Sequence, residues 1–405
     1  MYEKNKRKEH FHMYDVCILG GGAAGMAMAV DISTANPELS LVIIEKKGDM
    51  GLKLKATGNG RCNISNTECQ TFGETVKFFR RVGVEIKSNS DGWAYPVSEQ
   101  GEEVVEALKD RIAANNVSVF TDCIVNEISG EKDNFTVSCV NGKTFNAKRV
   151  VMAMGGKAAP SFGTTGDGYV LARKLGHKVT KLAPCLVPVM CENSLMGVNK
   201  GLRAKAQVTL FRHGEFVEKE TGEIQFTEEG LSGICIFSLS KYIVLNDRTT
   251  FDDYKIRVDF LPQYQNLEIF IILKERCRIN GMRTEKLLSS IVKDRAGVKL
   301  MKKWSDKKEY AKDLTDDEIK EIILSSKSVI YDVKGAGGWK EAQCTTGGVS
   351  WDDFNWETME SKVIPGIYFA GEIIDYSGPC GGYNLENAWV TGRKASRAIC
   401  TEFTR

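Results

Sequence analysis

Three glycines near the start of the chain, Gly20, Gly22 and Gly25, have the spacing of a dinucleotide-binding loop. In such a loop the first glycine permits a tight turn, the second lets backbone amides approach a pyrophosphate, and the third lets a helix pack closely on a strand. Glu45 follows about twenty residues later, where an acid accepts hydrogen bonds from ribose hydroxyls. We therefore expect this region to bind the ADP half of NAD or FAD, the alternative being a glycine-rich turn that binds nothing.

The elements around this loop are the ones that such binding needs. Residues 15–19 form a short apolar strand, a small-residue stretch with helical spacing runs to about residue 32, and residues 41–44 form a second apolar strand. Continuous apolar strands are typical of a parallel sheet that is covered on both faces. The pattern predicts a β-α-β unit whose helix directs free N–H groups at the phosphates.

Two later strand ends favour FAD over NAD. An apolar strand at residues 367–370 runs into Gly371-Glu372, and residues 151–154 run into Gly155-Gly156. The first is similar to the C-terminal strand and acid that close the FAD site of two-dinucleotide-binding-domain flavoproteins, and the second to their "ATG" strand-to-loop element. We predict no second dinucleotide domain, because Gly335-Ala-Gly337-Gly338 lacks a β-α-β context and is expected to be a loop. NAD(P)H would dock only transiently as electron donor.

An irregular segment at residues 57–63 supplies further candidates. Its small residues let backbone approach a ring system, and Arg61 could meet a phosphate or a substrate anion. The alternative is an asparagine- and glycine-rich loop held by its own side chains. Cys62 could attach the flavin, relay protons or fill a structural role, and we favour the structural role. The predicted cofactor contacts in this region are Lys53, Thr57, Gly60, Arg61, Cys62 and Asn63.

A second segment, residues 378–384, leads into the last predicted helix, which runs to about residue 403. Amides at that helix N-terminus would stabilise negative charge on a reduced ring, and an ordinary capping loop is the alternative. Asp375 would bind the ribityl chain or stand in solvent, and Asp167 would cap the helix beginning near Gly168 or contact the flavin. The other predicted cofactor contacts are Ala23, Ala24, Lys46, Val125, Gly155, Gly156, Asp167, Gly371, Glu372, Asp375, Gly382, Tyr383 and Asn384.

Several motifs together resemble those of one family. They are KLKATGNGRCN at residues 53–63, GTTGDGY at 163–169, FTEEGLSG at 226–233, TGGV at 346–349, GEIID at 371–375 and GGYN at 381–384. In this order, and over nearly the whole chain, they resemble the BaiN-like family of NAD(P)/FAD-dependent oxidoreductases, also described as aminoacetone-oxidase-family flavoproteins. Lys53 and Lys55 depart from the arginine–lysine pair more usual there, which keeps the positive charge but alters bidentate phosphate contact.

The resemblance implies reduction of conjugated C=C bonds in 3-oxo bile-acid intermediates, which are bulky, apolar, steroid-like enones. The same label covers amine or aminoacetone oxidases that use O2, and a third class is a non-catalytic flavin-bound redox sensor or RNA-modification partner. We favour the reductase, because an inserted domain is long enough to cover the ring and exclude solvent. Histidine occurs at only four positions, so we name Tyr383 and Arg61 as candidate catalytic residues.

The order of elements predicts the domain organisation. After Pro184 the chain changes to consecutive strands, then to a charged helical stretch at residues 266–327, and sheet character returns from residue 343. We predict an α/β fold with a Rossmann-type FAD-binding domain, like that of two-dinucleotide-binding-domain flavoproteins, at residues 1–184 and 342–405. A β-rich and then helical domain, residues 185–341, would be inserted as the substrate or cap domain.

Composition excludes several classes. A net charge of +2 over 405 residues argues against a nucleic-acid partner, and the basic cluster at Lys4, Lys6, Arg7 and Lys8 is expected to be a solvated tail. Twelve irregularly spaced cysteines without a CxxC pair argue against metal clusters. No apolar run approaches the ~18–20 residues of a membrane span, and no signal peptide is evident. We expect a cytoplasmic protein with a small-molecule substrate and no metal or membrane partner. The sequence does not determine its oligomeric state.

Overall fold

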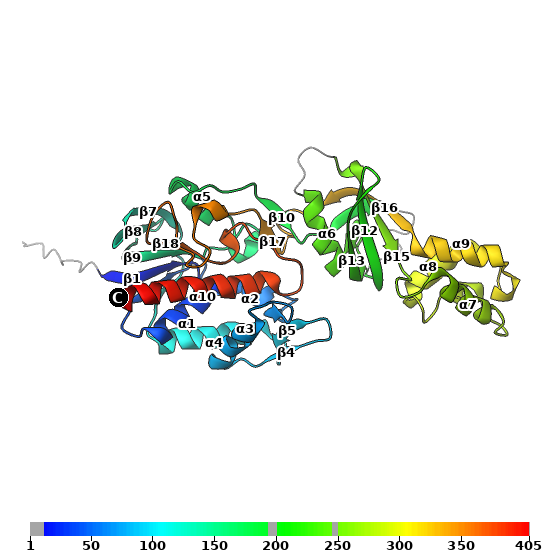
Figure 1. Cartoon of the computed structure of the whole chain (residues 1–405), viewed down its shortest axis with the longest axis horizontal. Helices are drawn as coiled ribbons and strands as arrows, with labels where there is room; N and C mark the ends of the chain where they lie inside the picture. Colours follow the sequence, from blue (N-terminus) through cyan, green and yellow to red (C-terminus); the bar gives the residue numbers. More distant parts are fainter. Residues whose placement is uncertain (1–11, 193–200, 245–249, 405) are drawn as a thin grey trace, which may run out of the picture. The chain divides into compact units, whose positions relative to one another are not determined.

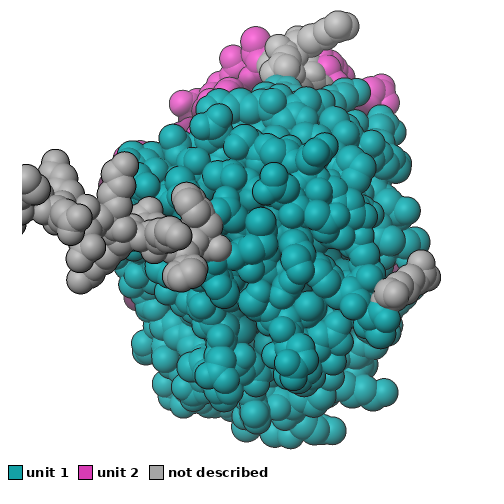
Figure 2. Space-filling view, turned by 90° about the vertical axis from the view of Figure 1, so that its left-hand side faces the viewer, with its two compact units in different colours: residues 1–183, 344–405 teal, residues 184–343 magenta. Residues whose placement is uncertain are grey.

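The computed structural model describes residues 12–192, 201–244 and 250–404, so the predicted basic tail lies outside the described residues. The chain divides into two compact units, which are coloured separately in Figure 2. Unit 1 comprises residues 1–183 and 344–405, and unit 2 comprises residues 184–343. In the described part of the chain, no helix is long and apolar enough to cross a membrane.

A seven-stranded sheet forms the centre of unit 1. Its order is β6-β2-β1-β9-β8-β7, and β18 also pairs with β9. The first three strands and β18 run parallel to their partners, whereas β7, β8 and β9 form an antiparallel meander. The strands are β1 (Met13–Leu19), β2 (Leu41–Ile44), β6 (Ser118–Phe120), β7 (Val125–Glu131), β8 (Asn134–Cys139), β9 (Thr144–Met152) and β18 (Ile367–Phe369).

The parallel strands are buried because helices cover them. Val16 to Leu19 of β1 are fully buried, as the continuous apolar run requires. Helix α1 (Ala23–Ala35) follows β1 and lies beside α10 (Tyr383–Thr404), the blue and red helices of Figure 1. The other helices of unit 1 are α2 (Leu52–Ala56), α3 (Phe72–Arg81), α4 (Gly101–Ala114) and α5 (Asp167–Lys174).

Unit 1 also contains a three-stranded sheet, and a two-stranded sheet forms where the chain passes from one unit to the other. Strands β3 (Ser65–Asn66), β5 (Trp93–Pro96) and β4 (Ile86–Ser88) form a three-stranded sheet. Strand β10 (Ala183–Cys185) pairs with β17 (Cys344–Thr346), where the chain leaves and re-enters unit 1.

Unit 2 contains a closed six-stranded barrel with its own apolar core. In the first half of β12 the side chains alternate, since Ala204, Ala206 and Val208 are buried while Arg203 and Lys205 are exposed. The barrel strands are β11 (Val189–Glu192), β14 (Gly230–Ser232), β13 (Glu215–Phe226), β12 (Arg203–Arg212), β15 (Tyr254–Asp259) and β16 (Val329–Ala336). Its helices are α6 (Ile234–Val244), α7 (Asn266–Cys277), α8 (Asp294–Ser305) and α9 (Asp316–Lys327).

Two local predictions are wrong. Gly335 and Ala336 belong to strand β16 rather than to a loop, whereas Gly337 and Gly338 lie beyond its end. Gly335 pairs with Met190 of strand β11. Asp167 does not cap α5, because Gly166 holds the cap position in a left-handed conformation (φ +85°). Asp167 is instead the first helical residue.

The end of α10 is fastened to the sheet by a buried arginine. Arg149 of β9 donates two hydrogen bonds to Glu402, at 2.9 and 2.8 Å, and a third to Asp133 at 2.7 Å. The guanidinium group lowers the pKa of Glu402 from 4.5 to about 2. Because the pKa is lower in the folded state, the stabilisation is present above about pH 4.5 and is lost as the pH falls toward 2.

Glu402→Gln should therefore lower the free energy of unfolding at neutral pH by about 1–3 kcal/mol. The difference in melting temperature between variant and wild type should shrink as the pH falls from about 5 to 2. Thermal melts across that range measure it, and Glu85→Gln, in an exposed pair with Arg80, is the control that should change little. An equal difference at pH 7 and at pH 3 would contradict this role for Glu402.

Candidate functional site

The glycine loop after β1 combines a tight contact with an open space. Gly20 has φ +106°, and its N–H donates to Ile44 at the end of β2 (2.8 Å). A Cβ at Gly25 would lie 2.0 Å from the carbonyl oxygen of Gly20. Helix α1 can therefore pack this closely on the end of β1 only because residue 25 is a glycine. A Cβ at Gly22, the N-cap of α1, would have no atom within 4 Å, and no side chain caps the helix there. Open space before uncapped amides suits a pyrophosphate.

Glu45 is fixed beside this loop by backbone amides. One carboxylate oxygen accepts a hydrogen bond from the N–H of Gly21 and the other from the N–H of Lys47, both at 2.8 Å. Each oxygen keeps a lone pair with which it can accept a ribose hydroxyl. Lys46 points elsewhere, since its ammonium group contacts Asp167 and the hydroxyl of Thr165, both at 2.6 Å. The predicted contact Val125 is a buried residue at the start of β7.

Glu372, from the C-terminal part of the chain, contacts Lys53 from the N-terminal part. Lys53 and Glu372 form an ion pair of 2.6 Å, and the other oxygen of Glu372 accepts from the N–H of Thr345 at 2.8 Å. A Cβ at Gly156 would lie 2.3 Å from the hydroxyl of Thr345 and 2.5 Å from Glu372. Segments far apart in the sequence thus converge here. Sequence reasoning missed Thr345, whose hydroxyl also accepts from the N–H groups of Lys157 and Ala158.

The loop at residues 57–63 holds a buried thiol and an exposed guanidinium. Cys62 is fully buried, and burial raises the pKa of its thiol to about 12, so the thiolate needed for nucleophilic attachment is disfavoured. Arg61 stacks over the Tyr95 ring at 4.8 Å, lies 3.8 Å from Glu99 and donates to the carbonyl oxygen of Gly58. Arg61 therefore contacts one residue of its own loop, Gly58, and two residues outside it, Tyr95 and Glu99.

Asn63 joins this loop to the N-terminus of α10. In the amide orientation that satisfies its neighbours, its oxygen accepts from the N–H of Gly382 (3.1 Å) and its nitrogen donates to the carbonyl oxygens of Ser65 and Ala94. A Cβ at Gly382 would lie 2.3 Å from the Ser65 carbonyl oxygen. Gly382 is therefore held by the side chain of Asn63 and packs closely on the backbone of Ser65.

Tyr383 begins α10 and bonds to an acid that sequence reasoning missed. Its hydroxyl donates to Glu68 at 2.5 Å. Partial burial, together with this hydrogen bond, raises the pKa of Tyr383 well above its usual value, so the phenol stays protonated at neutral pH. Asn384 closes its own loop, accepting from the N–H of Gly378 (2.9 Å) and donating to its carbonyl oxygen (3.1 Å). The Asp375 carboxylate has no hydrogen-bond partner among the described residues.

A buried acid, Glu386, fixes the first turn of α10 and was also missed. It accepts hydrogen bonds from the hydroxyls of Ser65 (2.6 Å), Thr71 and Thr75 (2.8 Å). These contacts hold the helix start against residues 65–75, which also carry Glu68. No sequence spacing marks the group, because its members lie more than 300 residues apart.

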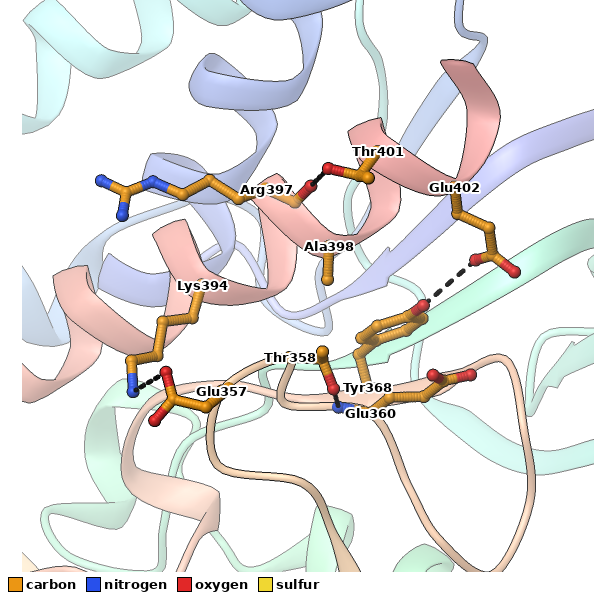
Figure 3. Close-up of a pocket in the computed structure, with 9 residues that line it drawn as sticks. All are labelled: Glu357, Thr358, Glu360, Tyr368, Lys394, Arg397, Ala398, Thr401 and Glu402. Carbon is orange, nitrogen blue, oxygen red and sulfur yellow. Dashed lines mark hydrogen bonds and ion pairs between the residues drawn. The ribbon is translucent and has the colours of Figure 1, made fainter. Parts of the chain in front are cut away.

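A pocket of about 520 Å³ lies elsewhere on unit 1, along the C-terminal half of α10 (Figure 3). None of the predicted site residues lines it. Its lining residues are Glu357, Thr358, Glu360, Tyr368, Lys394, Arg397, Ala398, Thr401 and Glu402. In the described part of the chain, no group of three or more His, Cys, Asp or Glu residues is arranged to hold a metal ion.

Comparison with known proteins identifies the family. The model of the HI0933-like protein Rossmann domain matches residues 70–398, which is most of the chain. The chain belongs to the HI0933-like family. The predicted family, the Rossmann-type fold with a β-rich inserted part, and the class of flavin-dependent oxidoreductase are thereby confirmed.

Curated relatives of this HI0933-like protein extend over nearly its whole length. It is 31% identical to the 3-dehydro-bile acid delta(4,6)-reductase of Clostridium scindens, over 95% of this chain and 99% of that protein. It is 24% identical to the ribosomal RNA dihydrouridine synthase of Escherichia coli, over 93% and 95%. Among solved structures, a 3-ketosteroid-delta4-(5alpha)-dehydrogenase from Rhodococcus jostii superposes with a TM-score of 0.49 at 14% identity, covering 98% of each chain.

Two substitutions test the cofactor contacts. Gly22→Val should abolish flavin retention, because the side chain would fill the open space before the α1 amides. Glu45→Ala should weaken FAD by about 1.5–3 kcal/mol through loss of charge-assisted hydrogen bonds. Acid precipitation of each purified variant measures the flavin released per chain. Gly73→Val, at another open glycine in a helix first turn, is the matched control and should keep its FAD.

Full flavin occupancy of Gly22→Val after dialysis would contradict this placement. Flavin that stays on the precipitate of the wild-type protein would contradict non-covalent binding and would point to Cys62.

Proposed function

We propose that this protein holds FAD non-covalently in unit 1 and reduces a C=C bond conjugated to a carbonyl group, with NAD(P)H as electron donor and a cytoplasmic location. The observation that carries the proposal is the open, uncapped α1 N-terminus beside the amide-bound Glu45. Gly371, which precedes Glu372, packs against Ala24 of the same helix. When bound, FAD would supply two-electron transfer to the double bond. The residues expected to contact it are those predicted from the sequence except Lys46, with Thr345 added.

The chain itself must bind the substrate and deliver a proton. Reduction at the β-carbon of an enone leaves charge on the α-carbon and the carbonyl oxygen, so an acid must protonate the product. Tyr383 is the candidate donor, because its phenol is protonated at neutral pH. Its single hydroxyl proton bonds to Glu68, so the hydroxyl would have to turn from Glu68 to the substrate in order to deliver it. Arg61, held by Tyr95 and Glu99, is the weaker candidate and is assigned to anion binding.

We assign substrate selection to the inserted segment, residues 185–341, as a substrate or cap domain. Its barrel and helices have an apolar core separate from that of unit 1, so its surface can vary without disturbing the cofactor site. The first candidate substrate is a bulky, apolar 3-oxo steroid enone, supported by the relative from Clostridium scindens.

A second candidate is the uracil ring of ribosomal RNA, supported by the two dihydrouridine synthases among the relatives. Its C5=C6 bond is conjugated to a carbonyl group, as is the double bond of an enone. Both candidates therefore need the same electron transfer and the same proton delivery, and they differ only in what binds the rest of the substrate.

Anaerobic stopped-flow measurements test whether the protein acts as a reductase or as an oxidase. We expect NADH or NADPH to bleach the flavin absorbance and a 3-oxo-Δ4 steroid to restore it under nitrogen, faster than air-saturated buffer does. Tyr383→Phe should slow the second half-reaction by about 10²–10⁴-fold and leave flavin content unchanged. Tyr14→Phe, at the start of β1 and therefore at the opposite end of that strand from the glycine loop, is the control.

If air restores the absorbance far faster than the enone, and aminoacetone or another amine bleaches it again, the oxidase alternative replaces the reductase. If Tyr383→Phe reacts with the enone at the wild-type rate, Tyr383 is not the proton donor.

A further inference from the structure

Charge is distributed very unevenly along this chain. Residues 276–308 contain eleven lysines and arginines but only three acids, a net charge of +8, whereas the whole chain has +2. This stretch, here called the basic segment, includes α8 and lies entirely within unit 2 (Figure 1, yellow-green to yellow). A local excess of this size creates a positive potential that the net charge of the chain conceals.

Most of these bases have no acidic partner among the side chains that the structure describes. Arg283, Lys302, Lys303 and Lys308 form ion pairs with nearby acids. The other seven do not, and one of them, Arg276, donates instead to the carbonyl oxygen of Leu287 and the hydroxyl of Ser290. Arg276 and Lys299 are half-buried and the other five are exposed; the seven are Arg276, Arg278, Lys286, Lys293, Arg295, Lys299 and Lys307.

Helix α8 presents part of this charge on one face. Arg295, Lys299 and Lys302 follow one another at intervals of four and three residues and therefore lie on the same side of the helix. Burial lowers the pKa of Lys299, and the neighbouring charge of Lys302 lowers it further. Like charges held together in this way favour binding of an anion that spans them.

The apolar face of α8 is already covered. Its residues Ala296, Leu300, Met301 and Trp304 are buried in the core of unit 2. A helix that binds a membrane surface needs free apolar side chains to insert between the lipids. The charged face of α8 is therefore suited to a polyanion in solution rather than to a bilayer.

We propose that the basic segment is a docking surface for the phosphate backbone of structured RNA. Lysine and arginine contacts to phosphates are independent of base sequence and orient a nucleic acid while another site acts on a base. The inference goes beyond the proposed reduction and supplies what its second candidate substrate requires. It opposes the expectation, drawn from net charge, that nucleic acid is not a partner.

Fluorescence anisotropy with the full-length, FAD-loaded protein tests the proposal. The probe is a labelled ribosomal RNA stem–loop of about 40 nucleotides, titrated between about 50 and 200 mM salt. The test variant is Arg295→Glu/Lys299→Glu. The control is Lys87→Glu/Lys205→Glu, which changes the net charge equally at two exposed lysines outside the basic segment.

Wild-type protein should bind the stem–loop with an affinity that falls steeply with salt, and the test variant should bind about tenfold or more weakly while the control stays near wild type. Circular dichroism and flavin content should show that both variants fold. No RNA binding, equal losses in test and control variants, or binding to anionic phosphatidylglycerol vesicles in place of RNA would overturn the proposal. Reduction of the steroid enone by the same preparations reports on the proposed function separately.

Discussion

The close approach of α1 to its neighbours is the constraint on which the candidate site depends. At Gly25 a single methyl group would strike the carbonyl oxygen of Gly20, and at Gly392 one would lie 2.9 Å from the carbonyl oxygen of Ala24. These contacts bring the start of α1 against the end of β1 on one side and against α10 on the other. Because Gly25 and Gly392 carry no side chain, α1 can pack directly on β1 and α10. This packing leaves the N-terminal amides of α1 facing the open space at Gly22.

The second requirement is closure by distant parts of the chain. Glu372 reaches Lys53, Asn63 reaches Gly382, and Glu386 reaches the hydroxyls at residues 65–75. All these contacts lie within unit 1, although residues 184–343 separate its two sequence segments. A barrel with its own core can be inserted there because the contacts that complete unit 1 do not include it.

The sequence was sufficient to predict what is encoded locally. The β-α-β unit, its glycine loop and Glu45 follow from hydrophobic period and spacing, and family, fold class and enzyme class are confirmed. Thr345, Glu68 and Glu386 could not be found in this way, because their partners are remote in sequence and only the fold joins them. Of the two roles predicted for Asp167, the helix cap rested on residue type alone and is wrong, because Gly166 takes that position with a left-handed backbone. Net charge concealed the basic segment because acids elsewhere offset it.

The central claim is that unit 1 binds FAD through its ADP half. Isothermal titration of the flavin-free protein tests this most directly, with FAD, FMN and ADP as ligands. Tight binding of FAD, weaker binding of ADP that competes with it, and little binding of FMN are expected, because the glycine loop and Glu45 would hold the pyrophosphate and the adenosine ribose, which FMN lacks. Binding of FMN as tight as that of FAD, with no competition from ADP, would contradict the claim.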